Sequence, residues 1–193
     1  MKVTALKEQL KDQNRVSIFV DNAYSFSLTL SQVIDQKIKV GMELSESMLA
    51  ELKKLSLEGK MYAQVLDWLS RRPHSTKEFQ QYMYKKKAPP EQTELFLQKL
   101  LDKGYLNDEH FAQWWQDKSQ FKHKSSRSIR AELSVKGIKS SVNNSGSDID
   151  AIKALISKLQ SRPRYADQNK LIRYLIGKGF SYSDIKSVLN DSD

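Results

Sequence analysis

The sequence predicts a mainly α-helical protein, in which tandem three-helix repeats form an elongated, curved array behind a small N-terminal β-hairpin. Apolar residues recur at helical spacing over most of the chain, and one such pattern occurs three times. Only 7 of the 193 residues are Gly and 4 are Pro, which is too few for a sandwich with many turns. We expect four segments: 1–44 with the hairpin and a short helix, 45–106 with repeat 1, 107–147 with repeat 2, and 148–193 with repeat 3.

The first thirty residues carry the strand signal. Apolar residues alternate with residues of the opposite face over 16–20, and with Ser and Thr over 24–30. The intervening residues, Asp21 to Ala23, have turn chemistry, so the segment is typical of a β-hairpin. A lone hairpin is only marginally stable, so it needs either residues 3–10 as a third strand or a helix to lie on.

Two serines mark the expected helix starts that follow the hairpin. Ser31 and Ser45 are candidate N-caps, because a serine oxygen can accept a backbone N–H of the first turn. The helix after Ser45 carries apolar residues at helical spacing over residues 48–55. Because the repeats bring their own apolar faces, we expect them to fold in a chain that lacks residues 1–44.

The repeated pattern is a set of apolar residues spaced i, i+3, i+4 and i+7. Its three copies are Tyr62, Val65, Leu66 and Leu69; Phe111, Trp114 and Trp115, with Lys118 at the fourth position; and, ninety positions after the first, Ile152, Leu155, Ile156 and Leu159. A second amphipathic helix follows each copy and ends in a basic turn, at Lys86-Lys87-Ala88, Lys136-Gly137-Ile138 and Lys178-Gly179-Phe180. A third helix follows in copies one and three, whereas residues 140–147 predict a short or irregular helix and a mobile loop in copy two.

The charge of the chain points to an acidic partner. The formal net charge is +9, and residues 61–140 hold fifteen of the basic residues against nine acidic ones. Residues 118–139 contain seven bases and the single acid Glu132. Nucleic acid is the commonest acidic partner, although each cluster alone is also typical of a solvated helix face. The candidate binding residues are Arg71, Arg72, Lys85, Lys86, Lys87, Lys118, Lys122, Lys124, Arg127, Arg130, Lys136 and Lys139.

The sequence contains no signal for an enzyme. Without Cys it has no disulfides, thiolate metal sites or Cys nucleophiles, and no phosphate loop or other catalytic motif stands out. His74, His110 and His123 lack metal-binding spacing, so we expect surface histidines and neither metal nor cofactor. Trp114 and Trp115 could stack on unpaired bases, but at least one is expected in the core. The apolar runs are too short for a membrane span or signal peptide, so we expect a cytoplasmic protein that does not engage membranes.

Several short motifs of the sequence resemble those of a known protein family. The segment from Gly104 to Ala112, GYLNDEHFA, is similar to the element that joins the first and second repeats of the RecX family of bacterial recombination regulators. Residues 69–75, 129–138 and 171–180 resemble its repeat helices and turns, and the N-terminal hairpin is similar to its variable start. The likeness covers about residues 60–190. One departure is Lys87-Ala88-Pro89, which stands where the family usually has Lys-Gly and an apolar residue.

The resemblance implies a non-enzymatic regulator of recombination, DNA repair and the SOS response. Such a protein binds RecA recombinase, or its filament on single-stranded DNA, and inhibits strand exchange and ATP hydrolysis, usually with some affinity for single- or double-stranded DNA. We expect it to act as a monomer. A DNA-binding transcriptional repressor is the alternative, because residues 75–106 also read as helix-turn-helix. An RNA-binding or scaffold protein is a third reading, and it would not depend on RecA.

Overall fold

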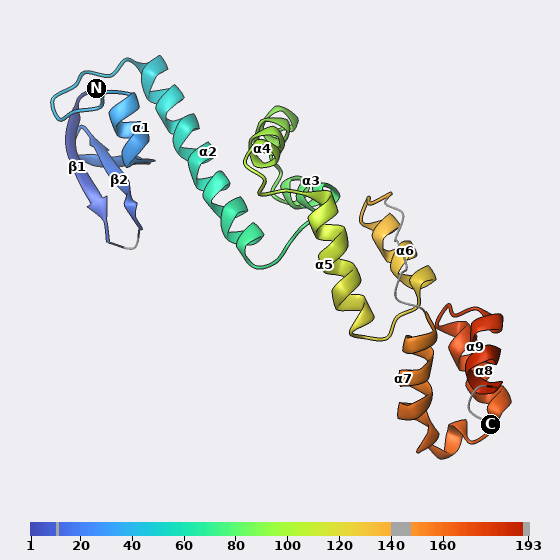
Figure 1. Cartoon of the computed structure of the whole chain (residues 1–193). Helices are drawn as coiled ribbons and strands as arrows, with labels where there is room; N and C mark the ends of the chain where they lie inside the picture. Colours follow the sequence, from blue (N-terminus) through green and yellow to red (C-terminus); the bar gives the residue numbers. More distant parts are fainter. Residues whose placement is uncertain (11, 140–147, 191–193) are drawn as a thin grey trace. The chain divides into compact units, whose positions relative to one another are not determined.

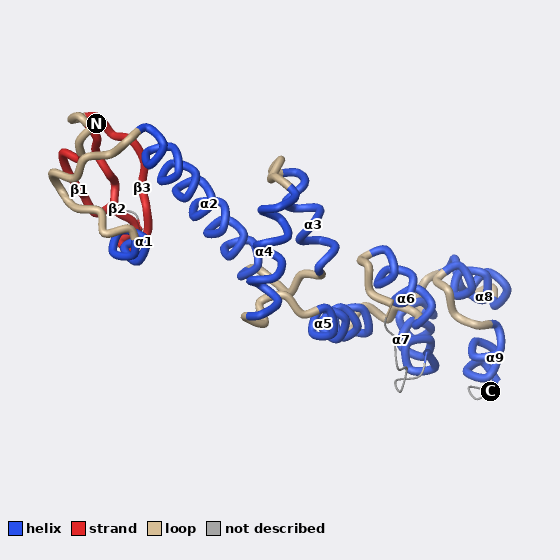
Figure 2. Tube along the Cα trace, turned by 90° about the horizontal axis from the view of Figure 1, so that it is seen from above, coloured by secondary structure: helices blue, strands red, loops and turns tan. Residues whose placement is uncertain are grey.

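The structure is a computed structural model that describes residues 1–10, 12–139 and 148–190 (Figure 1). Strands occupy only the N-terminal part of these residues, and the rest is helical (Figure 2). The strands are β1 (Val3–Gln9), β2 (Asp12–Val20) and β3 (Ala23–Thr29). The helices are α1 (Leu30–Asp35), α2 (Glu46–Ser70), α3 (Thr76–Lys85), α4 (Pro90–Asp102), α5 (Asp108–Gln120), α6 (Ser126–Val135), α7 (Asp148–Gln160), the 3-10 turn η1 (Pro163–Tyr165), α8 (Gln168–Gly177) and α9 (Tyr182–Asn190).

This architecture confirms a mainly helical fold with a small β element at the N-terminus. The chain divides into two compact units, residues 1–72 and residues 73–193, and each is described by itself below. The division into three repeats and the curved array stay predictions. The irregular helix expected over residues 140–147 lies outside the described residues. None of the helices in the described part of the chain is both long and apolar enough to cross a membrane.

The predicted hairpin is present and has a third strand. The sheet is antiparallel in the order β1-β2-β3, with Val16 opposite Leu28 across the hairpin and Val3 opposite Val20 on the other side. Asp21 and Asn22 have φ values of 49° and 68°, as a two-residue turn matched to the strand twist requires. The segment before the hairpin therefore supplies the strand that the hairpin needs for stability.

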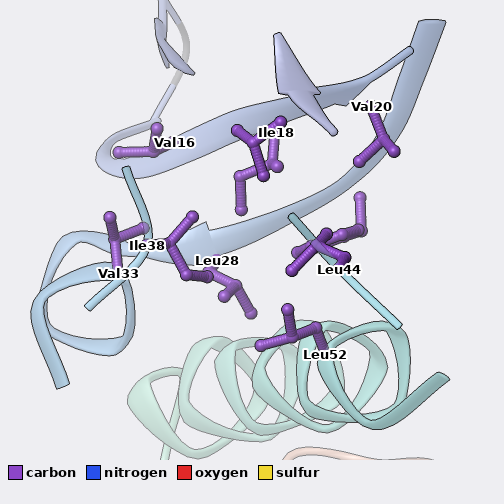
Figure 3. Packing of buried hydrophobic residues seen from close by; sticks show 10 residues of the cluster. Val16, Ile18, Val20, Leu28, Val33, Ile38, Leu44 and Leu52 are labelled. Atoms are coloured by element: carbon purple, nitrogen blue, oxygen red, sulfur yellow. The ribbon is translucent and has the colours of Figure 1, made fainter. Parts of the chain in front are cut away.

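A helix covers the sheet as well, so both expected supports are present. Ile18 and Leu28 from the strands and Leu52 from α2 are buried together in one apolar core (Figure 3). A polar link crosses the same contact, where the Ser56 hydroxyl of α2 donates to the Ser27 carbonyl oxygen at 2.6 Å. The sheet and α2 thus form one structural unit.

The helix starts agree with the sequence at one serine and differ at the other. Ser45 caps α2, because its side chain accepts from the Met48 N–H. Ser31 does not cap α1, and that prediction was wrong. Thr29 is the cap: its side chain accepts from the Gln32 N–H at 3.2 Å, while the Gln32 side chain accepts from the Thr29 N–H at 2.9 Å. This reciprocal capping box starts the helix nearer to β3 than the serine would.

In the second unit, each helix buries its apolar face against its neighbours. Phe111 of α5 packs with Ile129 and Leu133 of α6 in one core cluster. Helices α7, α8 and α9 form another cluster around Ile152 and Leu175. The buried residues of these helices are therefore among those that the helical spacing predicts for the first and second helices of copies two and three.

A serine hydroxyl links successive second helices. Ser75 caps α3 and donates from Oγ to the carbonyl oxygen of Lys136, at the C-terminus of α6, over 2.9 Å. Ser125 caps α6 and donates in the same way to the carbonyl oxygen of Lys178, at the end of α8, over 2.8 Å. Each hydroxyl also accepts the N–H of its own helix, so one atom serves both the cap and the junction.

An aspartate makes a second recurring bond at the same junctions. The Thr76 N–H donates to Asp108 Oδ1 at 2.7 Å, and the Ser126 N–H donates to Asp148 Oδ1 at 2.9 Å. Both aspartates are the first residues of their helices, α5 and α7. These two equivalent bonds hold the N-termini of α3 and α6 in place. The position of α6 in turn determines which of its faces is exposed to solvent.

Candidate nucleic-acid interface

Helix α6 presents two arginines to solvent. Ile129 and Leu133 are almost fully buried and hold the helix against α5. Arg127 and Arg130 are exposed, as the helical spacing from Ile129 and Leu133 predicts. Residues three apart on a helix are surface neighbours, so the two guanidinium groups belong to one patch. We call Lys122, Arg127 and Arg130 the α6 basic cluster.

A hollow of about 640 Å³ opens beside the two arginines. Its other walls are the start of α7 and the Gly179–Ser181 turn before α9. Asp148 and Asp184 also line it, so the hollow itself has mixed charge. The two arginines and the two aspartates of the lining balance in charge, so the hollow by itself does not indicate an anion site.

The two lysines that precede α6 differ in their surroundings. Lys122 lies exposed in the turn between α5 and α6. Lys124 forms an ion pair with Glu132, and its side chain is only 33% exposed. The other carboxylate oxygen of Glu132 accepts from Trp115 Nε1 at 3.0 Å. Lys124 is thus part of a packed polar contact, and reversing its charge would disturb α6 itself.

Two further candidate lysines lie against the tryptophans. The ammonium group of Lys118 is 4.8 Å from the ring centroid of Trp114, and that of Lys136 is 5.2 Å from the ring centroid of Trp115. Lys136 also forms an ion pair with Glu78 of α3. Trp114 and Trp115 are half-buried and pack against the α5–α6 core, which agrees with the prediction that at least one of them belongs to the core. Neither ring is presented as an open stacking surface.

One histidine prediction was wrong. His74 is buried, and its Nδ1 lies 3.1 Å from Glu78 Oε2. The other oxygen of Glu78 contacts Lys136, so the carboxylate joins α3 to α6. Glu78 lies only four positions after His74, so the pair itself is local, whereas its burial depends on tertiary packing that the sequence does not show. His110 is exposed, as expected, and His123 is half-buried.

The remaining candidate residues lie elsewhere. Lys85, Lys86 and Lys87 are exposed at the end of α3, with the Lys86 ammonium group 5.5 Å from the Tyr82 ring centroid. Lys139 is exposed and is the last described residue before α7. Arg71 and Arg72 belong to the first unit, where Arg71 pairs with Asp67 at 2.8 Å and Arg72 is half-buried.

An exposed aromatic residue beside the cluster escaped the sequence analysis. Phe121 is 86% exposed and directly follows α5, adjacent to Lys122. The signal was present, because Phe121 is the one apolar residue among polar and basic neighbours from residue 116 to 125. Trp114 and Trp115 fit the repeated apolar pattern, whereas Phe121 lies beyond the end of that pattern.

Two family models match the ends of this chain. One is described as the regulatory protein RecX N-terminal domain and matches residues 1–45. The other is described as the third three-helix domain of RecX and matches residues 148–189. The second match coincides with the cluster of α7, α8 and α9, which packs around its own core.

Relatives and solved structures resemble the whole chain. The regulatory protein RecX of Listeria innocua is 31% identical over 194 residues, covering 94% of this chain and 72% of that protein. That of Bacillus pumilus is 27% identical, covering 98% and 77%. A crystal structure of regulatory protein RecX matches with a TM-score of 0.72 and 24% identity over 98% of each chain. RecX from Lactobacillus salivarius matches at 0.59 and 23% identity, over 69% of this chain and 95% of that one.

Proposed function

Because the chain belongs to the RecX family of regulatory proteins, we propose that it binds RecA recombinase, or the RecA filament on single-stranded DNA, and restrains it. The likeness to a relative over 94% of the chain carries this proposal. The protein would act by binding alone, so it would lower RecA's strand exchange and DNA-dependent ATP hydrolysis without turning over a substrate itself.

The α6 basic cluster is the part of the surface best suited to the DNA of such a filament. Arginine and lysine side chains contact backbone phosphates without regard to sequence, as a regulator of a filament on any DNA requires. Arg127 and Arg130 are exposed on one side of a helix whose opposite side is fixed in the core. They can therefore meet phosphates without any change in the fold.

The experiment is RecA's ATP hydrolysis on single-stranded DNA, measured at low salt with increasing amounts of this protein. We expect hydrolysis and strand exchange to fall at stoichiometric amounts or below, while the protein alone hydrolyses no ATP. Unchanged RecA rates at excess protein would contradict the proposal.

The alternative, a sequence-specific repressor, predicts a different binding behaviour. A repressor prefers one duplex site by orders of magnitude over random DNA. In the structure, the N-terminus of α3, the first helix of the suggested helix-turn-helix, is occupied by its bonds to Lys136 and Asp108. Selection of binding sites from random duplexes distinguishes the two functions: one enriched sequence would favour the repressor, and no enrichment favours the filament regulator.

A further inference from the structure

We propose that Phe121 stacks on an unpaired base of single-stranded DNA while the neighbouring cations hold the phosphates. This inference rests on the proposed function, since it assigns a base contact within the same interface. Phe121 is 86% exposed, so most of its surface is open to solvent. An exposed phenyl ring gains nothing for folding, because it leaves its apolar surface in water.

The turn that carries Phe121 is held in one conformation. The Lys124 N–H donates to the Ser119 carbonyl oxygen at 3.2 Å, and the His123 N–H donates to that of Gln120 at 2.8 Å. His123 has a φ of 51°, so these bonds form the Schellman motif that closes a helix. The Phe121 N–H itself donates to the carbonyl oxygen of Asp117 at 3.1 Å. The backbone is therefore ordered before any ligand binds, and stacking costs little conformational entropy.

The charge around the ring favours a nucleic-acid base over an apolar protein surface. Lys122 follows Phe121 directly, and Lys118 precedes it by one helical turn, and both are exposed. Arg127 and Arg130 follow on α6 and are exposed as well. Sites for single-stranded nucleic acid combine cations that track the backbone with aromatic rings on which bases stack. A hydrophobic partner would instead have to desolvate these cations.

The other aromatic rings of α5 cannot take this role in the observed structure. Trp114 and Trp115 contact each other and Phe111, with ring centroids 5.7–6.0 Å apart. Lys118 lies over Trp114 and Lys136 over Trp115. Phe121 is thus the aromatic side chain of the α5–α6 hairpin that offers an open face.

The test compares Phe121→Ala, Phe121→Leu and Phe121→Tyr with the wild-type chain, using fluorescence anisotropy of a labelled oligothymidine. A second oligonucleotide of equal length carries abasic sites, so it keeps the phosphates and lacks the bases. Leu95→Ala is the matched control, because Leu95 is also a large exposed apolar residue but lies on α4. Thermal unfolding establishes that each variant is folded.

We expect Phe121→Ala and Phe121→Leu to weaken binding of oligothymidine at least about fivefold, while Phe121→Tyr and Leu95→Ala stay near wild type. The variants should bind the abasic oligonucleotide equally, and their salt dependence should not change, because no phosphate contact is lost.

Two results would overturn the inference alone. Wild-type affinity of Phe121→Ala for oligothymidine is the first, and if that variant also lost RecA inhibition, the ring would be assigned to a protein partner. Wild-type affinity of Phe121→Leu is the second, and it would indicate a generic apolar contact. Absence of DNA binding by the wild-type chain would end the base contact together with the DNA part of the proposed function.

Discussion

Gly179, which ends the α8 turn, is fixed by a close contact as well as by its backbone conformation. Its φ is +91°, and a Cβ placed there would lie 2.6 Å from Ser125 Oγ, the hydroxyl that bonds to Lys178. Gly104 has a similar φ of +68°, but no described atom lies within 4 Å of its Cβ position. A substitution at Gly104 therefore introduces backbone strain alone, whereas a substitution at Gly179 introduces backbone strain together with a steric conflict.

We predict that Gly179→Ala lowers the free energy of unfolding by about 2 kcal/mol or more, and Gly104→Ala by about 1 kcal/mol. The extra cost at Gly179 is the displaced junction hydroxyl. Urea unfolding of both variants measures the difference. Equal losses would mean that the Ser125 bond to α8 contributes nothing to stability.

The same comparison bears on Lys87, which stands in the equivalent turn after α3. Its φ is 56°, so the left-handed conformation is present there without glycine. At Gly137 a Cβ would lie 3.0 Å from Lys77 Cβ of α3. The left-handed conformation alone therefore does not require glycine, whereas the close approach of another helix at Gly137 and Gly179 favours it.

Single residues also show where sequence reasoning stops. The outward direction of Arg127 and Arg130 followed from helical spacing alone. The ion pairs of Lys124 and Lys136 did not, because Glu132 and Glu78 lie 8 and 58 positions away along the chain. Counting charges in a segment locates a basic region, but only the packing of helices decides which cations are already paired.

At the scale of elements, local patterns predicted most of the structure. The alternation before and after Asp21 gave the hairpin, and helical spacing gave the buried faces of α5 and α6. The sequence left open whether a third strand or a helix supports the hairpin, and the structure has both. The sequence predicted two separate helical runs, one around Met48 and one around Tyr62, whereas α2 is one helix of 25 residues. Gly59 is the one Gly or Pro between these runs, and a single Gly does not end a helix.

The serine caps show a different kind of limit. Ser75 and Ser125 can be recognised as caps from their positions before amphipathic helices. Their bonds to Lys136 and Lys178 cannot, because the acceptors lie 61 and 53 residues away. A cap is a local device, and the second use of its hydroxyl depends on tertiary structure.

For the whole molecule, the two compact units meet at residue 72, inside the segment expected as repeat 1, and the division at residue 44 stays a prediction. Helix α2 packs on the sheet through Leu52 and Ser56, so a chain lacking residues 1–44 would expose that face. We predict that fragments 1–72 and 73–193 each unfold cooperatively, since each contains its own apolar cores. Circular dichroism during thermal unfolding measures this. A fragment without a sigmoidal transition would show that the two units need each other to fold.

The α6 basic cluster is the proposed site of DNA binding. The decisive variant combines Lys122→Gln, Arg127→Gln and Arg130→Gln, and leaves Lys124 with its partner Glu132. Its matched control removes the same charge from exposed positions of α2, through Lys53→Gln, Lys54→Gln and Lys60→Gln. Because exposed charges contribute little to stability, both triple variants should keep the wild-type thermal midpoint within a few degrees.

The measurement is the protein concentration that halves RecA's ATP hydrolysis on single-stranded DNA. Three lost phosphate contacts reduce the salt slope by about 2, so we predict that this concentration rises more than about tenfold for the cluster variant. The α2 control should stay within about twofold of the wild type, because overall charge is not the cause. Equal inhibition by the wild type and a folded cluster variant would contradict the assignment of the interface to α6.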